Sequence, residues 1–271
     1  MNGRRLLIAN RGEIALRIAR AAAELGIGTT AVYSEDDAAS LHRSGCDTAV
    51  ALKGSGAKAY LDVEQVVAAA RDSGCDAVHP GYGFLAENAT LARACREAGL
   101  VFIGPSPEVL DLFGNKSAAR ALATRLGVPV LAGSESEVTA GEAAAFLDRL
   151  GGGGAIAIKA VSGGGGRGIR IVANPDEVAE AHARCCSEAN AAFGNAAVYV
   201  EQALRHARHI EVQIAGDRTG EVIHLHEREC SLQRRHQKIM EVAPSPSLTP
   251  ALRERITSAA VAMAREARYE G

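Results

Sequence analysis

The sequence lacks both a long apolar run and a marked excess of charge of either sign. Its longest apolar runs are short, such as residues 155–158, whereas a membrane-spanning helix needs roughly 20 apolar residues. Two arginines near the start are followed by polar residues at 10–13, so we expect no signal peptide. Lysine and arginine number 30 against 32 acidic residues, a net charge of −2, so no basic surplus indicates nucleic-acid binding. We therefore expect neither a membrane nor a nucleic acid among its partners.

Cysteine occurs six times but never with the CxxC spacing of many metal sites. Cys185 and Cys186 are adjacent in a helical pattern, where we expect free thiols rather than a strained disulfide. This usage indicates a reducing compartment, and the expected location is the cytoplasm. Apolar residues make up 47% and charged residues 23% of the 271, which excludes disorder, collagen and coiled coil.

Residues 1–130 alternate short apolar runs with amphipathic helical patterns. Apolar residues at positions 14, 18, 21, 22 and 25 follow the helical period. The predicted elements are a strand at 6–9, a helix at 14–25, strand 29–33, helix 63–71, strand 77–79, helix 91–98 and strand 101–103. Strands joined by helices pair in parallel, so we predict an α/β fold with an open, doubly wound sheet.

The next part of the chain predicts a small α+β module, with strands at 155–160, 169–172 and 197–201 and helices at 140–150 and 177–189. Strict alternation then places His209, Glu211 and Gln213 on one face of a strand. This strand and a second at 221–228 predict an antiparallel hairpin, followed by a helix at 248–267. We expect the hairpin to have an unpaired edge and an uncovered apolar face at 210, 212 and 214.

Two glycine-containing turns are candidate phosphate sites. The turn at 10–13 has one glycine where the dinucleotide fingerprint needs three, which disfavours an oxidoreductase, and Glu35 is more simply a solvated strand end than a ribose ligand. In the second, Lys159 precedes the glycine-rich loop 163–168, an order opposite to that of a P-loop. Lys159 can face a phosphate while the loop's backbone N–H groups form an anion-binding nest. The alternative is an empty surface hairpin.

Residues 227–238 combine glutamate, arginine, glutamine, histidine and lysine within a dozen positions. Together with the polar face at 209–213, they suit a small anion and a polyphosphate. The alternative is a solvated charged loop, because charge content alone does not establish a site.

Several of these segments resemble the biotin carboxylase family of ATP-grasp enzymes, and the resemblance covers essentially the whole chain. They are residues 8–15 (IANRGEIA), residues 79–88 (HPGYGFLAEN), Lys159 with its glycine loop, and residues 227–238 running on to 244. The resemblance implies an N-terminal α/β domain at 1–130, an ATP-grasp lid at 131–203, and the truncated beginning of an antiparallel C-terminal domain at 204–271.

The resemblance also implies a ligase activity, the ATP-dependent carboxylation of biotin with bicarbonate through carboxyphosphate. The protein is then the biotin carboxylase component of an acyl-CoA or pyruvate carboxylase. The implied cofactors are ATP, Mg²⁺ or Mn²⁺, and biotin as a substrate on its carrier. The implied partners are a biotin carboxyl carrier, a carboxyltransferase and a second copy in a homodimer. Two alternatives are another ATP-grasp ligase similar to carbamoyl-phosphate synthetase and a nucleotide-binding fragment without turnover.

Residue roles follow from the same resemblance. Lys238 is the implied catalytic residue, which holds bicarbonate. The resemblance implies that the phosphates are contacted by Lys116 and Lys159, and that the lid loop closes over them with Gly165 and Gly166. It implies that the adenine is contacted by Glu201, Gln202, Ala203 and Leu204, and that the pocket is lined by His209, Gln233 and His236.

The chain departs from the family pattern at two places. Glycines at 152–154 replace a Tyr-Pro-Val sequence before the lid strand, and Val242 stands where many relatives have a second acid after Glu241. The family's metal-binding carboxylates and catalytic arginine are implied to lie beyond residue 271. We therefore assign no metal ligand and expect residues 1–271 alone not to turn over.

Overall fold

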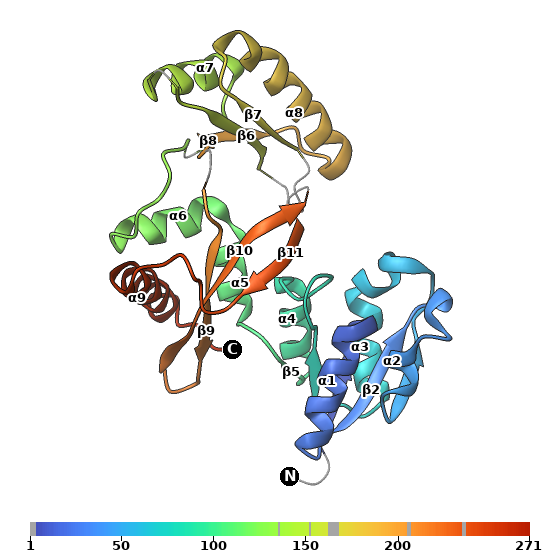
Figure 1. Cartoon of the computed structure of the whole chain (residues 1–271). Coiled ribbons are helices and arrows are strands. Elements are labelled where there is room, and N and C mark those ends of the chain that lie inside the picture. The colour runs from blue at the N-terminus through green and yellow to red at the C-terminus, as the bar shows by residue number, and fades with distance from the viewer. Residues whose placement is uncertain (1–3, 135, 152, 162–167, 205–206, 235–236) are drawn as a thin grey trace. The chain divides into compact units, whose positions relative to one another are not determined.

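The computed structural model describes residues 4–134, 136–151, 153–161, 168–204, 207–234 and 237–271 (Figure 1). The chain divides into two compact units. Unit 1 comprises residues 1–116, 215–223 and 264–271, and unit 2 comprises residues 117–214 and 224–263. The domain boundaries near 130 and 203 stay predictions.

Unit 1 is built on the predicted parallel sheet, with strand order β3-β2-β1-β4-β5. Its strands are β1 (Arg5–Ile8), β2 (Gly28–Tyr33), β3 (Thr48–Ala51), β4 (Ala77–His79) and β5 (Val101–Phe102). All neighbouring strands pair in parallel, which confirms the doubly wound fold. β3 was not predicted, because its four residues at the edge of the sheet are too short a run to show a period.

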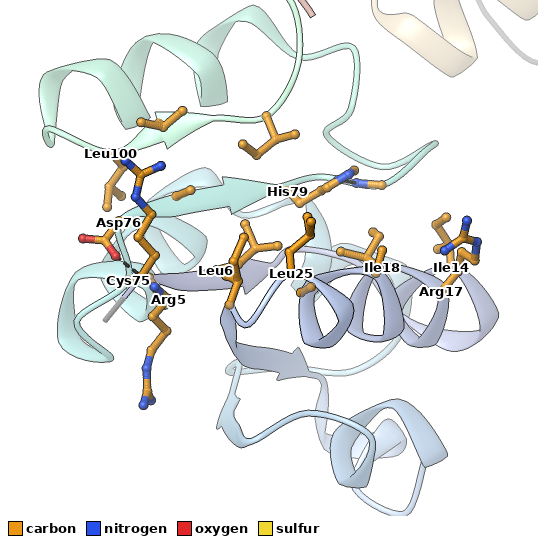
Figure 2. A pocket seen from close by; sticks show the side chains of 18 of the residues that line it. Arg5, Leu6, Ile14, Arg17, Ile18, Leu25, Cys75, Asp76, His79 and Leu100 are labelled. Atoms are coloured by element: carbon orange, nitrogen blue, oxygen red, sulfur yellow. Dashed lines mark hydrogen bonds between the residues drawn. The ribbon is translucent and has the colours of Figure 1, made fainter. Parts of the chain in front are cut away.

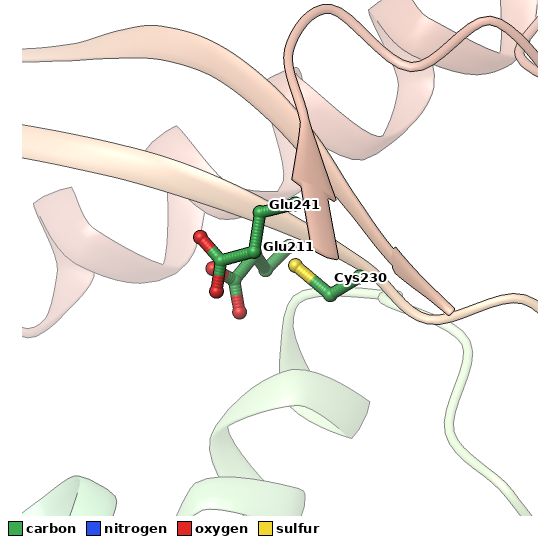
Figure 3. Close-up of side chains that lie close together, drawn as sticks. All are labelled: Glu211, Cys230 and Glu241. Atoms are coloured by element: carbon green, nitrogen blue, oxygen red, sulfur yellow. The ribbon is translucent and has the colours of Figure 1, made fainter. Parts of the chain in front are cut away.

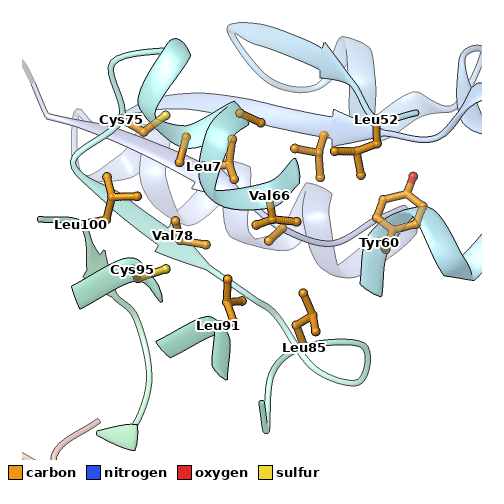
Figure 4. Close-up of a cluster of buried hydrophobic side chains, with 14 of the residues drawn as sticks. Leu7, Leu52, Tyr60, Val66, Cys75, Val78, Leu85, Leu91, Cys95 and Leu100 are labelled. Carbon is orange, nitrogen blue, oxygen red and sulfur yellow. The ribbon is translucent and has the colours of Figure 1, made fainter. Parts of the chain in front are cut away.

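Both faces of this sheet are packed, as alternation along β1 requires. Leu7 and Ala9 belong to a cluster with Val66 and Leu91 (Figure 4). Leu6 and Ile8 point the other way and pack with Ala15, Ile18 and Ala22 of a helix. The helices of this part are α1 (Gly12–Glu24), α2 (Leu41–Ser44), α3 (Val63–Asp72), α4 (Ala89–Glu97) and α5 (Pro107–Gly114).

Unit 2 contains a small antiparallel sheet, order β7-β6-β8, packed against two helices, within the segment that the resemblance predicts as the lid. Its core contains Ile156, Ile158, Val200 and Cys185. Its elements are α7 (Ala140–Arg149), β6 (Ile156–Ala160), β7 (Ile169–Val172), α8 (Val178–Phe193) and β8 (Val198–Gln202). The helix α6 (Lys116–Arg125) precedes them. Cys185 and Cys186 are free thiols, as predicted.

A third sheet, order β11-β10-β9, precedes the last helix, α9 (Pro250–Glu266). Its strands are β9 (Ile210–Gly216), β10 (Val222–Arg234) and β11 (Gln237–Val242). The sequence did not predict β11, which pairs with β10 in antiparallel register, so the free edge of the predicted hairpin among the described residues is that of β9. β11 was missed because its residues lie in a charged segment and all six are exposed, so no apolar period marks it. Among the described residues, no helix combines the length and apolarity that crossing a membrane requires.

Candidate functional site

A cluster of alternating charges lies on the sheet β9–β10–β11. The carboxylate of Glu211 on β9 accepts a hydrogen bond from Arg228 Nε at 2.8 Å and another from Lys238 Nζ. Glu241 on β11 lies 3.6 Å from both Arg228 Nε and Lys238 Nζ. Two carboxylates and two cationic side chains thus form a cluster with no net charge.

The register of the sheet explains why these side chains meet. His209 O accepts from Cys230 N at 2.7 Å, so β9 and β10 face each other there, and Arg228 reaches Glu211 two residues along. On the other side of β10, Gln233 is opposite Lys238 and Arg234 is opposite Gln237. Residues that are far apart in the sequence therefore share one sheet surface.

Lys238 is held as a cation. The hydrogen bond from its ammonium to Glu211 raises the pKa of Lys238 above its ordinary value. Burial opposes ionisation of Glu211, but hydrogen bonds from Lys238 and Arg228 outweigh it and lower the pKa of that carboxyl. An ammonium has three N–H donors and no acceptor, so Lys238 suits an anion and not the role of a base.

Glu211, Cys230 and Glu241 have potential ligand atoms within 4.8 Å of one another (Figure 3). Both carboxylates already pair with Arg228 and Lys238. The positive charges of these two side chains oppose the binding of a cation. Burial raises the pKa of the Cys230 thiol, which disfavours the thiolate that binds a metal. We therefore assign no metal site here.

His209 and Gln233 are joined beside this cluster. Gln233 Nε2 lies 2.8 Å from His209 Nδ1 and donates to Cys230 O at 2.9 Å. If the amide nitrogen donates to both groups, Nδ1 is the acceptor and the proton of the neutral imidazole is on Nε2. The structure thus brings His209, Gln233 and Lys238 onto one sheet. His236 lies outside the described residues.

The sheet β7-β6-β8 holds another pair of implied nucleotide ligands. Glu201 on β8 is opposite Ala157 of β6, which places Lys159 diagonally across the ladder. The two side chains form an ion pair in which Lys159 is 25% and Glu201 16% exposed. Gly165 and Gly166 lie outside the described residues.

The other residues implied to contact the adenine lie at the end of β8, where backbone hydrogen bonds hold the chain. Gln202 N donates to Ala132 O and Ala203 N to Ala155 O, each at 2.8 Å, while the Leu204 side chain is exposed. Lys116 is the exposed first residue of α6.

Sequence reasoning assigned no role to Glu211, Arg228 or Glu241. The alternation at 209–213 had placed Glu211 on the polar face, which was the available signal. Arg228 and Glu241 could be recognised only once β10 and β11 were paired.

Unit 1 interlocks two of the segments that carry the family resemblance. Asn10 Nδ2 donates to Pro80 O at 2.7 Å and to Tyr82 O at 2.8 Å, and the Tyr82 hydroxyl bonds Glu13. Gly81 has φ +66° and would place a Cβ 2.7 Å from Asn10 Nδ2, so a side chain there is excluded twice over. The turns after β1 and β4 are therefore fixed to each other.

A cavity of about 1280 Å³ also lies in unit 1, beside α1 and along β4 and β5 (Figure 2). Its lining combines apolar side chains such as Leu6, Ile18 and Leu25 with several arginines and His79, whose pKa is lowered by burial. Of the predicted site residues that the structure describes, none lines this cavity.

Comparison with protein families gives two adjoining matches. Residues 2–110 match the biotin carboxylase N-terminal domain, and residues 115–271 match the ATP-binding domain of the carbamoyl-phosphate synthase L chain.

Among curated proteins, pyruvate carboxylase of Bacillus subtilis is 53% identical over 268 residues, and mitochondrial pyruvate carboxylase of Mus musculus is 50% identical over 271. Each match covers 98% of this chain but 23% of the relative, so the chain spans about a quarter of their length.

Solved structures agree. Biotin carboxylase from Campylobacter jejuni, in a β,γ-ATP complex, has a TM-score of 0.94 at 41% identity, over 99% of this chain and 60% of that one. The biotin carboxylase domain dimer of Hydrogenobacter thermophilus 2-oxoglutarate carboxylase, with MgADP, ADP and bicarbonate, has a TM-score of 0.91 at 42% identity, over 99% and 59%.

Proposed function

The chain belongs to the biotin carboxylase family of ATP-grasp proteins, and on this basis we propose that it carboxylates biotin with ATP and bicarbonate. An oxygen of bicarbonate attacks the γ-phosphorus, and the bond to ADP breaks with its electron pair leaving on ADP. Carboxyphosphate then splits into CO₂ and phosphate. The ureido nitrogen of biotin bonds to CO₂, and its proton leaves to the phosphate.

The observation that carries this proposal is Lys238, fixed as a cation beside His209 and Gln233. One of its N–H donors is directed at Glu211, which leaves donors for a bicarbonate oxygen. Phosphoryl transfer depends on positioning and charge neutralisation, so an oriented ammonium next to a nucleotide site supplies what the first step needs.

The nucleotide is bound by the lid and by the sheet β9–β11. Lys159 contacts the phosphates, which compete with Glu201 for its ammonium, and Lys116 adds a second cation. Gly165 and Gly166 close over the phosphates. Glu201, Gln202, Ala203 and Leu204 contact the adenine, and His209, Gln233 and His236 line the pocket. Mg²⁺ neutralises phosphate charge when bound; its ligands are unassigned and no step above depends on them.

The wider assembly follows from the relatives. Since the relatives include pyruvate carboxylases and a biotin carboxylase domain dimer, we assign to the protein a biotin carrier, a carboxyltransferase and a homodimeric state. The final acceptor is pyruvate or an acyl-CoA, and the location is the cytoplasm.

The match to the carbamoyl-phosphate synthase domain supports a second candidate, an ATP-grasp ligase that does not use biotin. Phosphate release from ATP, measured in the intact protein with Mg²⁺ and bicarbonate, separates the two. We expect hydrolysis that requires bicarbonate and rises with free biotin. Hydrolysis that needs bicarbonate but ignores biotin supports the second candidate, and nucleotide binding without hydrolysis contradicts both.

A further inference from the structure

The sheet that carries Lys238 has a second group of polar side chains, which is buried. Arg228 and Cys230 of β10 belong to the charged cluster around Glu211. The residues between and beside them, Glu227 and Glu229, bond instead to the segment before α9. Both glutamates are buried, at 0% and 8% exposure.

Glu229 is the centre of this buried group. Its Oε2 accepts from Ser245 Oγ at 2.7 Å and from Ser247 Oγ at 2.6 Å. Its Oε1 accepts from Ser231 Oγ and lies 3.4 Å from Arg208 Nη1. Hydrogen bonds from Ser231, Ser247 and Ser245 lower the pKa of Glu229 to about 2, so it is a carboxylate across the physiological range.

Ser231 connects this carboxylate to His209. Because the Ser231 hydroxyl donates its single proton to Glu229, its oxygen is left as an acceptor, and His209 N donates to it at 2.9 Å. His209 O in turn accepts from Cys230 N at 2.7 Å. The backbone of His209 is thus held through both its polar groups, and Gln233 holds the ring.

We propose that Glu229 is a positioning residue for the nucleotide site, which sets the place of the His209 imidazole by orienting the Ser231 hydroxyl. Glu229 touches no substrate; it acts only through Ser231 and the backbone of residue 209. The proposal rests on the proposed function for the part that His209 plays in nucleotide binding.

Glu227 offers a matched control. It lies two residues away and is more deeply buried. It accepts from Arg253 Nε at 2.8 Å and from Ser245 N at 3.0 Å. Within the described residues it bonds neither Ser231 nor His209, and it shares only Ser245 with Glu229. A purely structural role for the two glutamates predicts that Glu227→Gln and Glu229→Gln act alike.

The first measurement is the affinity for MgADP by calorimetry on the 271-residue chain, with the melting temperature of each variant recorded. We expect Ser231→Ala and Glu229→Gln each to weaken binding five- to tenfold. The double variant should bind MgADP no more weakly than the weaker-binding single variant, because both substitutions break the same link from Glu229 through Ser231 to His209. Ser231→Thr keeps the hydroxyl and should restore most of the affinity. Glu227→Gln should lower the melting temperature yet change affinity less than twofold.

The second measurement needs no nucleotide. The imidazole NMR signals of His209 should move in Ser231→Ala and Glu229→Gln and stay in place in Glu227→Gln. Unmoved signals in folded Ser231→Ala protein, or additive losses of affinity in the double variant, overturn the positioning role. If instead His209→Ala binds MgADP like the unmodified chain, the proposed nucleotide site itself is wrong, although the NMR result still decides whether Glu229 positions the ring.

Discussion

The charged network around Asp37 in unit 1 and the one around Glu211 in unit 2 differ in their exposure to solvent. In unit 1, Asp37 is 6% exposed and receives Arg11 through two nitrogens, Tyr60 Oη at 2.7 Å and Ser40 Oγ at 2.9 Å. In unit 2, the four members of the cluster around Glu211 have side chains between 24% and 43% exposed.

The two networks differ in whether a ligand from solvent can reach their charged groups. The Asp37 carboxylate is surrounded by donors of the protein itself, so it binds nothing else and its contribution is to stability. The Lys238 ammonium is held by carboxylates yet reachable from solvent, so an anion can approach it. A closed network fixes the turn after β2, and an open one supplies a binding surface. Five predictions test this comparison.

The largest expected effect concerns the open network. Lys238→Ala should reduce bicarbonate-dependent phosphate release in the intact protein by about a hundredfold, because a positioned cation is lost from the reacting anion. The affinity for ATP should change less than threefold, and the exposed Lys58 of unit 1 provides the control as Lys58→Ala. A parallel loss of ATP affinity would mean that Lys238 binds the nucleotide and not bicarbonate.

The closed network predicts a loss of stability without a loss of binding. Asp37→Ala should lower the free energy of unfolding by roughly 2–3 kcal/mol, since it leaves Arg11 and Tyr60 without their shared acceptor. Urea unfolding measures this. An unchanged midpoint would contradict the structural role.

The same carboxylate predicts a pH dependence. The hydrogen bond from Arg11 holds the pKa of Asp37 well below its ordinary value. The stabilisation from the Asp37 carboxylate is therefore complete above the pKa of the unfolded chain, which is about 4. It is lost as the pH falls from that value towards the lower pKa of the folded state. The gap in stability between the unmodified chain and Asp37→Ala should be constant from pH 7 to 5 and narrow by pH 3.

A smaller effect is expected in the lid. Lys159→Ala should weaken ATP binding roughly tenfold by removing a cation from the phosphates. Arg170→Ala is the control, because Arg170 pairs with Glu188 on the same lid and has no proposed contact with the nucleotide. Equal effects of the two variants on affinity would show that lid stability, and not the charge of Lys159, controls binding.

The smallest effects should be alike in both units. Asp62 caps α3 by accepting Gln65 N at 3.0 Å, and Thr139 caps α7 in a reciprocal bond with Glu142. Replacing either by alanine should cost about 1 kcal/mol in urea unfolding and leave ATP affinity unchanged. A much larger cost at one of them would show that the two units differ in local stability as well as in the use of charge.

Short apolar runs predicted the parallel sheet and the strands β6, β7 and β8, and the helical period predicted α1, α8 and α9, because a helix buries one regular apolar face. These patterns missed β11, whose side chains are all exposed, and therefore the way that β10 is covered. The resemblance placed Lys238, His209 and Gln233 in a site, and the structure brings them together on one sheet, but their roles stay predictions.

The sequence by itself determined the fold class, the family and the residue types that a phosphate and a small anion need. Tertiary structure alone decided which of those charges meet. Lys238 on β11 bonds Glu211 on β9, with β10 between them, and Glu229 is connected to His209 through Ser231. A local pattern records which face a side chain occupies, whereas strand order and register decide its neighbours, and these depend on pairings between distant segments.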